Sequence, residues 1–198
     1  MQMATFRMKP AYRSAGIDDV AQLRKDGQVY FVNVLTKSTV SNAPSGNGTI
    51  GADSQWTVIK PKSIVDREEK YMGHLCPVMS FQNVDSGKFL AIKDGALALG
   101  EAAGHDTEFM VLHMARNNVY RLIHHNDHGR SIGFNGDGST KNAENVKEGE
   151  SGHFYIFNVG DVQARWGEEG VLPVAAPSAD EVAGKSAVAV AAAAAAAK

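Results

Sequence analysis

A short apolar segment led by an aromatic residue occurs three times in this sequence, and it constrains the fold more than any other feature. The copies are DSQWTVIK at 53–60, DTEFMVLH at 106–113 and SGHFYIFN at 151–158. Each aromatic residue is followed two positions later by another apolar residue, and alternate side chains of a β-strand lie on one face. We therefore expect Trp56, Phe109 and Phe154 to point into one core from three separate strands.

A second pattern, a glycine followed by a strand and a turn, precedes each aromatic strand. The copies begin at Gly27 (GQVYFVNV), Gly87 (GKFLAIKDG) and Gly129 (GRSIGFNGDG). Gly87 and Gly129 are 42 residues apart, and Phe109 and Phe154 are 45 residues apart. The order of the two patterns is the same three times, and a repeat of about 40 residues predicts three structural lobes.

A further strand opens the second and third copies. The two segments are VMSFQNV at 78–84 and VYRLIHH at 119–125. Alternation predicts that Met79 and Phe81 face the core, with Tyr120 and Leu122 in the matching places of the third copy.

The recurring order of glycine, strand, turn and aromatic strand over residues 20–160 resembles the β-trefoil superfamily, which includes fibroblast growth factors, interleukin-1, fascin and hisactophilin. The resemblance implies an all-β domain in which three pseudo-repeats form a six-stranded barrel capped by hairpins. It also implies a structural core in which the three aromatic residues meet Leu90 and Ile132 near the barrel interior.

The domain is expected to have an extension at each end. Residues 1–19 precede the trefoil at 20–160, and residues 161–198 form a tail rich in Ala and Pro. Alanine favours helix, but the run is short and has no apolar stripe that could dock. We expect the tail to be flexible or marginally helical.

Charge limits the partners of the domain. Acidic and basic residues balance over residues 1–160, so the formal net charge of −2 comes from residues 161–198. A neutral body has no long-range field that would attract nucleic acid or an anionic membrane. No apolar run approaches the roughly 20 residues of a membrane helix. The sequence therefore predicts neither a nucleic-acid partner nor a membrane span.

Cysteine content and the N-terminal segment bear on the cellular compartment. Cys76 is the only cysteine, which excludes an intramolecular disulfide. The segment MQMATFRMKPAYRSAG lacks the apolar region of a secretory signal, although its mildly basic, acid-free character leaves a short transit peptide as an alternative. We expect a cytoplasmic protein.

Three histidines cluster in the sequence HHNDHG. Neutral imidazoles bind Zn²⁺, so His124, His125 and His128 with Asp127 are candidate metal ligands. Structural zinc needs four ligands, and Cys76 lies in a different lobe, so no metal site is expected. Trefoils like hisactophilin carry histidine-rich loops, and this resemblance implies a pH-responsive surface. An ordinary solvated turn remains the alternative.

Catalytic motifs are missing from the sequence. It has no G-x-S-x-G, H-E-x-x-H, P-loop or dinucleotide-binding pattern. Cys76 lies beside Pro77 with no identifiable partner base, which favours an inert buried thiol. We therefore expect no enzyme activity and no cofactor.

Two ligand classes of trefoil proteins are also disfavoured. Ricin-like lectins repeat the pattern Q-x-W, whereas Gln55 and Trp56 are adjacent and occur in one lobe. Growth factors that hold heparin carry a basic loop in the third lobe. Here Lys141 and Lys147 lie among acidic residues, so heparin is not an expected partner.

The fascin and hisactophilin branch of the superfamily fits these properties best. The resemblance implies a non-enzymatic intracellular protein-interaction module that binds actin or another cytoskeletal assembly. The alternative is a leaderless secreted ligand, like a cytokine or growth factor, that binds a receptor at the cell surface.

Overall fold

The computed structural model describes residues 22–23, 26–48, 50–60, 68–115, 117–147 and 149–166. The expected N-terminal extension at 1–19 and most of the expected tail lie outside these residues. Within the described part of the chain, no helix is long and apolar enough to span a membrane.

The described residues form nine strands, one α-helix and four short 3-10 helices. The strands are β1 (Gln28–Asn33), β2 (Trp56–Ile59), β3 (Glu68–Tyr71), β4 (His74–Asn83), β5 (Phe89–Lys93), β6 (Ala96–Gly100), β7 (Phe109–Met114), β8 (Val119–His124) and β9 (Phe154–Asn158). The helices are η3 (Ala52–Ser54), η4 (His105–Thr107), η5 (Ala143–Asn145), η6 (Glu150–Gly152) and α1 (Val159–Trp166).

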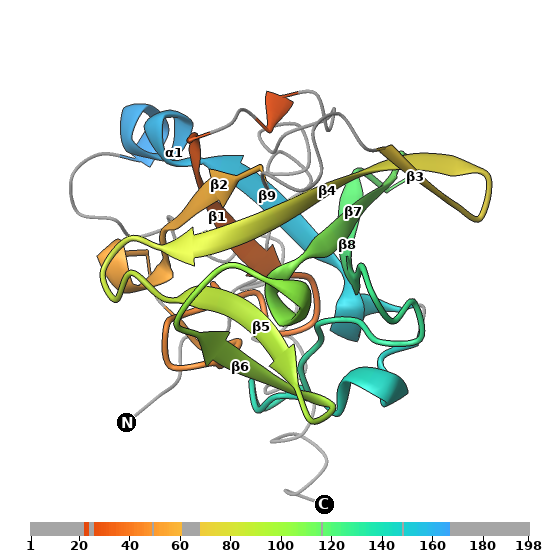
Figure 1. The fold of residues 1–198 in the computed structure, drawn as a ribbon. Helices are drawn as coiled ribbons and strands as arrows, with labels where there is room; N and C mark the ends of the chain where they lie inside the picture. Colours follow the sequence, from red (N-terminus) through yellow and green to blue (C-terminus); the bar gives the residue numbers. More distant parts are fainter. Residues whose placement is uncertain are drawn as a thin grey trace, which may run out of the picture.

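Six of the strands close into a barrel (Figure 1). Going round it, β1 pairs with β2, β2 with β4, β4 with β7, β7 with β8, β8 with β9, and β9 again with β1, all antiparallel. Each barrel strand therefore has two neighbours, and closure leaves no free edge within the ring. The six-stranded barrel predicted from the sequence is confirmed.

A hairpin caps the barrel in each of the three lobes. In the second lobe it is β5–β6, closed by Asp94 and Gly95 with φ angles of 51° and 74°. Such a pair of positive φ angles is what a tight two-residue hairpin turn requires. The other two lobes have shorter hairpins, marked by the bridges Thr39 to Gly48 and Phe134 to Thr140. The all-β trefoil architecture is confirmed.

The first copy of the glycine pattern is not equivalent to the other two, so this part of the predicted repeat is wrong. GQVYFVNV forms β1, a barrel strand equivalent to β4 and β8, whereas GKFLAIKDG forms the hairpin strand β5. The counterpart of Gly87, with φ 68°, is Lys37, with φ 58°. The amide of Lys37 donates to the carbonyl of Asn33 at 2.9 Å, as that of Gly87 does to Asn83 at 3.0 Å. A lysine in the left-handed region, where glycine is the usual residue, concealed the repeat.

The five residues expected in the core share one buried cluster. Trp56, Phe109 and Phe154 are each the first residue of their strand, and all three are fully buried together with Leu90 and Ile132. The inward-facing residues expected of the opening strands lie in the same cluster: Met79, Phe81, Tyr120 and Leu122. The inward register predicted by alternation is therefore observed.

Helix α1 covers the outer face of β1 and β9. Val159 and Val162 pack in a second buried cluster with Tyr30 and Phe157. The side chain of Asn158 donates to the Asp161 carboxylate at 3.1 Å, within the first turn of the helix. The boundary expected at residue 160 thus falls inside α1, and the packed domain continues at least to Val162.

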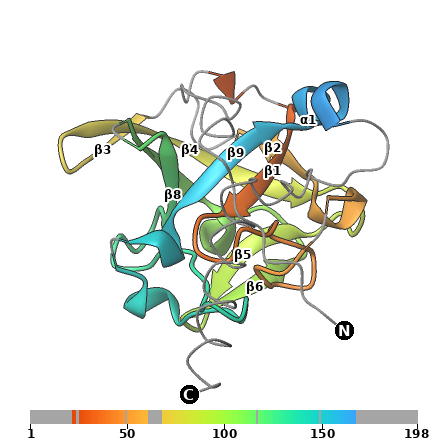
Figure 2. The same ribbon diagram turned by 180° about the vertical axis from the view of Figure 1, so that it is seen from behind.

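The β3–β4 hairpin is an addition to the six-stranded barrel. The first half of β4 pairs with β3, and its second half joins the barrel. Met72 and Gly73 close the hairpin with φ angles of 49° and 85°. It projects from the barrel on the side away from α1, as seen from the front and from behind (Figures 1 and 2).

Candidate functional site

The histidine-bearing loop follows β8 and returns at Arg130. The amide of His124 donates to the carbonyl of Arg130 at 2.9 Å, which closes the loop. Inside it, Asp127 accepts from the amides of Gly129 at 3.1 Å and Arg130 at 3.0 Å. The guanidinium of Arg130 also contacts the carboxylates of Asp127 at 3.1 Å and Glu144 at 2.8 Å. The loop is therefore held by its own polar groups.

The three histidines do not form the exposed surface that the sequence suggested. His124 is only 6% exposed, and its ring packs edge-on to Phe109 at 6.2 Å. His125 is half-buried, with its Nδ1 3.4 Å from the carboxylate of Glu108. His128 is exposed and lies edge-on to Tyr71 at 5.6 Å. Of the three, only His128 lies on an open surface.

Burial sets the protonation of His124. Desolvation lowers the pKa of its imidazole, because the charged form loses its hydration. The carboxylates of Asp106 and Asp127 act in the opposite direction, and Arg130 acts with burial. Since burial outweighs the carboxylates, His124 is neutral at pH 7.

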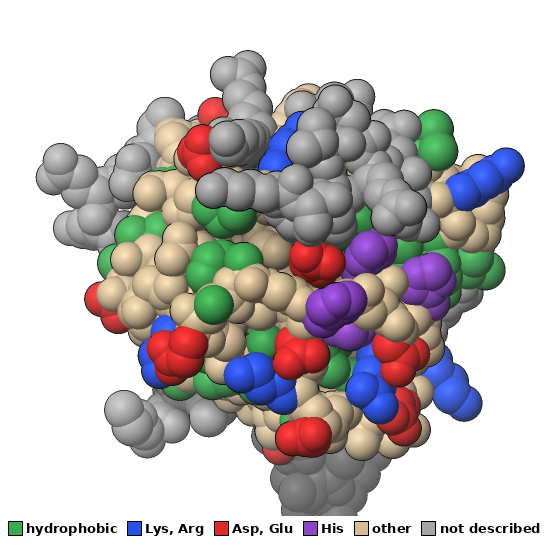
Figure 3. All heavy atoms as spheres, in the orientation of Figure 1, with side chains coloured by type: hydrophobic (Ala, Val, Ile, Leu, Met, Phe, Trp, Pro, Cys, Tyr) green, Lys and Arg blue, Asp and Glu red, His purple; other side chains and the backbone are tan. Residues whose placement is uncertain are grey.

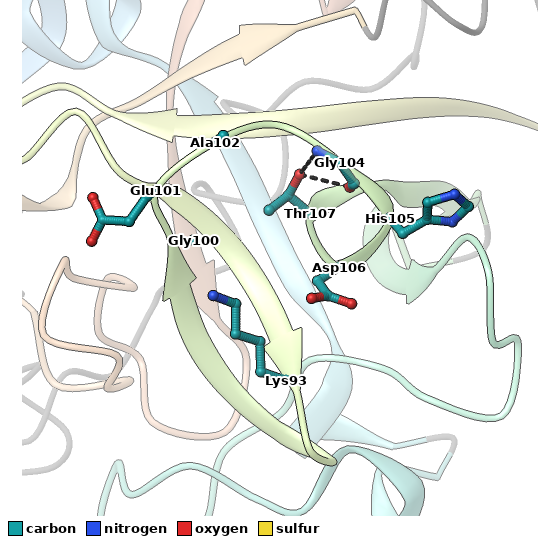
Figure 4. A pocket seen from close by; sticks show the side chains of 8 residues that line it. All are labelled: Lys93, Gly100, Glu101, Ala102, Gly104, His105, Asp106 and Thr107. Carbon is teal, nitrogen blue, oxygen red and sulfur yellow. Dashed lines mark hydrogen bonds between the residues drawn. The ribbon is translucent and has the colours of Figure 1, made fainter.

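A shallow cavity of about 270 Å³ lies beside this loop (Figure 4). Its lining residues come from the end of β5, the end of β6, the segment between β6 and η4, and η4 itself: Lys93, Gly100, Glu101, Ala102, Gly104, His105, Asp106 and Thr107. Thr107 is occupied in holding η4 together, because its hydroxyl accepts from the Gly104 amide at 2.8 Å and donates to the Gly104 carbonyl at 2.9 Å.

Charged groups of the cavity are distributed unevenly. Figure 4 shows the Glu101 side chain directed away from Lys93 and Asp106. Glu101 instead forms an ion pair with Lys88 at 2.7 Å, which lowers the pKa of its carboxyl. This leaves Lys93 and Asp106, two opposite charges, as the ionic groups available to a ligand.

The cavity and the histidine loop are joined by η4. Asn126 of the loop donates to the carbonyl of His105 at 3.0 Å. His105, Asp106 and Glu108 were not singled out in the sequence, although they lie just before the aromatic residue of the second copy. In a trefoil this segment lies against the end of the next lobe's opening strand, and that relation is the signal that could have identified them.

Metal-ligand groups and the Cys76 thiol were the other chemical candidates in the sequence. Among the described residues, no group of three His, Cys, Asp or Glu side chains is placed to hold a metal ion. Burial raises the pKa of the Cys76 thiol, which disfavours the reactive thiolate.

A second surface feature is the end of the β3–β4 hairpin. Met72 and Leu75 are the most exposed large apolar side chains of the described residues, at 68% and 65%. Figure 3 shows hydrophobic atoms at this edge of the molecule, with histidine side chains gathered on the face beside it. The base of the hairpin is anchored, because Cys76 and the half-buried Tyr71 pack in the third apolar cluster.

No protein-family model matches the sequence, and no curated protein matches it. Many solved chains are similar in fold, and two of them are described here. One is a mosquitocidal holotoxin, with a TM-score of 0.54 and 12% identity over 67% of this chain and 16% of the holotoxin chain. The other is ThreeFoil, a designed 3-fold symmetric protein, with a TM-score of 0.51 and 12% identity over 68% of this chain and 100% of ThreeFoil. The chain described here has three lobes and a closed six-stranded barrel, and it is similar to a designed threefold-symmetric protein. Together these findings establish that this chain has the β-trefoil fold.

Proposed function

We propose that this chain is a non-enzymatic protein-interaction module that binds its partner through the end of the β3–β4 hairpin. The observation that carries the proposal is the exposure of Met72 and Leu75 on an element added to the barrel. Burying both side chains in a partner would contribute about 2–4 kcal/mol, or roughly 30-fold or more in Kd.

The shape of the hairpin favours a protein over a small molecule. Small ligands bind in concave sites, whereas this apolar surface is the convex end of a projecting hairpin. Its tight turn at Met72 and Gly73 and its packed base at Cys76 fix the two side chains before binding. Such preorganisation reduces the entropy that is lost on association.

The chemistry around the tip favours an acidic partner. Lys70 and His74 flank the apolar residues and are both exposed. A partner with an apolar depression and an acidic rim would match this arrangement. Actin filaments, or another cytoskeletal assembly in the cytoplasm, are the partner class we propose, on the sequence resemblance to fascin and hisactophilin. The two similar solved structures do not bear on that choice.

Co-sedimentation with actin filaments tests the proposal. We expect wild type to sediment with the filaments and the variant Met72→Ser/Leu75→Ser to lose at least tenfold in affinity. The matched control is Leu35→Ser/Val84→Ser, which removes two apolar side chains that are each 39% exposed elsewhere on the surface. The control should bind like wild type.

Each contrary outcome has a distinct meaning. If wild type does not sediment, actin is the wrong partner. Saturable binding to intact cells would then favour the alternative of a secreted ligand. If the hairpin variant binds as wild type does, the β3–β4 tip is not the binding surface.

A further inference from the structure

The last residue of the opening strand is structurally equivalent in the three lobes. These residues are Asn33 in β1, Asn83 in β4 and His124 in β8. In each lobe the next amide donates at 2.9 Å to the carbonyl just before an aromatic strand: Val34 to His153, Val84 to Gln55 and His125 to Glu108. The backbone thus makes the same corner three times, while the side chain at the corner differs.

In the first lobe the asparagine amide fastens this corner. The Nδ2 of Asn33 donates to the carbonyls of Ser151 at 2.9 Å and His153 at 3.1 Å. Its Oδ1 accepts from the amides of Leu35 and Thr36, each at 3.1 Å. One buried side chain therefore joins the turn after β1 to the segment before β9.

The second lobe repeats the arrangement. The Nδ2 of Asn83 donates to the carbonyls of Asp53 at 2.8 Å and Gln55 at 3.1 Å. Its Oδ1 accepts from the amides of Asp85 at 3.1 Å and Ser86 at 2.9 Å. The carbonyls lie three residues and one residue before the aromatic residue, as they do in the first lobe.

The third lobe has an imidazole where the other two have an amide. His124 is buried as the asparagines are, with 6% exposed against 0% and 1%, but its ring nitrogens approach the backbone of His105 without a well-formed hydrogen bond. The side-chain contact from loop to η4 is made instead by Asn126, an exposed residue, to the His105 carbonyl at 3.0 Å. The side-chain hydrogen bonds that stabilise this corner are therefore weaker than those at the other two corners.

The groups that face His124 come from three elements. Asp106 of η4 and Asp127 of the loop favour its charged form, and Arg130 of the loop opposes it. Phe109 of β7 presents its ring edge. Beside them, His125 and Glu108 form their own contact, and Arg130 is engaged by Asp127 and Glu144.

We propose that the third corner is a pH-sensitive latch, in which protonation of His124 releases the loop 124–130 from η4. A protonated imidazole is more stable in water than among Phe109 and the barrel core, so below about pH 6.5 the opened corner binds the proton in preference to the closed one. Because η4 forms one wall of the cavity, opening also changes that cavity. The latch is a property of the fold and does not depend on the partner proposed above.

Hydrogen exchange of single amides tests the latch in the wild-type protein. The reporter is the His125 amide, and the internal references are the equivalent amides of Val34 and Val84. After correction for intrinsic rates, a one-proton opening lowers protection by up to tenfold per pH unit below about pH 6.5. We expect this decrease at His125 between pH 7.5 and 5.5, with little change at the two references.

Two variants identify the group responsible. His124→Asn gives the third corner the side chain of the other two, so protection at residue 125 should become independent of pH. His128→Asn removes an exposed neighbour and should leave the wild-type response unchanged. Equal protection at both pH values in wild type would overturn the proposal, as would an unchanged response in His124→Asn. If that variant does not fold, His124→Gln and the wild-type comparison of the three amides still decide the question.

Discussion

Replacing Asn83 with alanine measures how much the asparagine corner stabilises the domain. Asn83 is 1% exposed, and its amide donates two hydrogen bonds to backbone carbonyls. Both carbonyls keep a second donor, because Asp53 also accepts from the Asn42 amide at 2.8 Å and Gln55 from the Val84 amide at 2.9 Å. The variant thus loses two part-buried hydrogen bonds without leaving a carbonyl unsatisfied.

The expected cost follows from those two bonds. At about 0.5–1.5 kcal/mol each, the free energy of unfolding should fall by about 1–3 kcal/mol. The two amides that donate to the Oδ1 of Asn83 belong to exposed residues and can donate to water in the variant. Their loss therefore adds little to the decrease in the free energy of unfolding. For a domain of this size the loss corresponds to a decrease in Tm of roughly 4–8 °C for a central value of about 2 kcal/mol.

Urea unfolding followed by tryptophan fluorescence provides the measurement, with Gln82→Ala as the matched control. Gln82 is the preceding residue, and its side chain donates to the carbonyl of Gly87 at 2.8 Å in an exposed contact. The control should change stability by less than about 0.5 kcal/mol. Equal losses in the two variants would refute the reasoning that burial makes the Asn83 contacts stabilising.

Three further predictions concern the core, the histidine and the tail. Truncating Trp56, Phe109 or Phe154 to alanine should cost about 3–5 kcal/mol in denaturant unfolding, since each is fully buried; a loss under 1 kcal/mol would contradict their place in the core. Burial lowers the pKa of His124, so the folded domain is stabilised relative to the unfolded chain when this histidine is neutral. This contribution to the free energy of unfolding is complete above about pH 6.5 and is lost as pH falls toward the pKa of the folded state. The free energy of unfolding of wild type should therefore fall by up to about 1.4 kcal/mol per pH unit more than that of His124→Asn in this window. Parallel plots of unfolding free energy against pH for the two proteins would exclude the effect. Removal of residues 170–198 should leave Tm nearly unchanged in calorimetry, whereas a decrease of more than about 5 °C would show that the tail packs on the domain.

Much of the fold could be predicted because it depends on local pattern. The side chains of a strand alternate between two faces, so the aromatic strands and residues such as Phe81 and Leu122 identify the core face directly. The Asp94-Gly95 pair marks its hairpin for a similar reason, since few residues adopt positive φ easily. Where an uncommon residue took that conformation, at Lys37, the same reasoning missed the first copy of the corner.

The candidate site could not be predicted to the same degree. The histidine cluster was visible in the sequence, but the loop carries polar residues that are typical of a solvated turn. Its partner segment η4 is distant along the chain, and no local pattern connects His105 to Asn126. No sequence pattern predicts that Met72 and Leu75 are exposed at a hairpin tip. Alternation of apolar and polar residues does not distinguish a barrel strand from a hairpin that extends beyond the barrel.

The sequence was therefore sufficient to predict a three-lobed domain, the inward faces of its strands and its core, although not the place of the first glycine pattern, because each of these follows from the conformations of neighbouring residues. Tertiary structure alone decided that His124 is buried in the place of an asparagine, since the segment before Phe109 packs across the end of β8. It also decided that the β3–β4 hairpin leaves apolar side chains in solvent. Burial and exposure are properties of the segments that meet in space, and a residue's own sequence neighbours do not specify them.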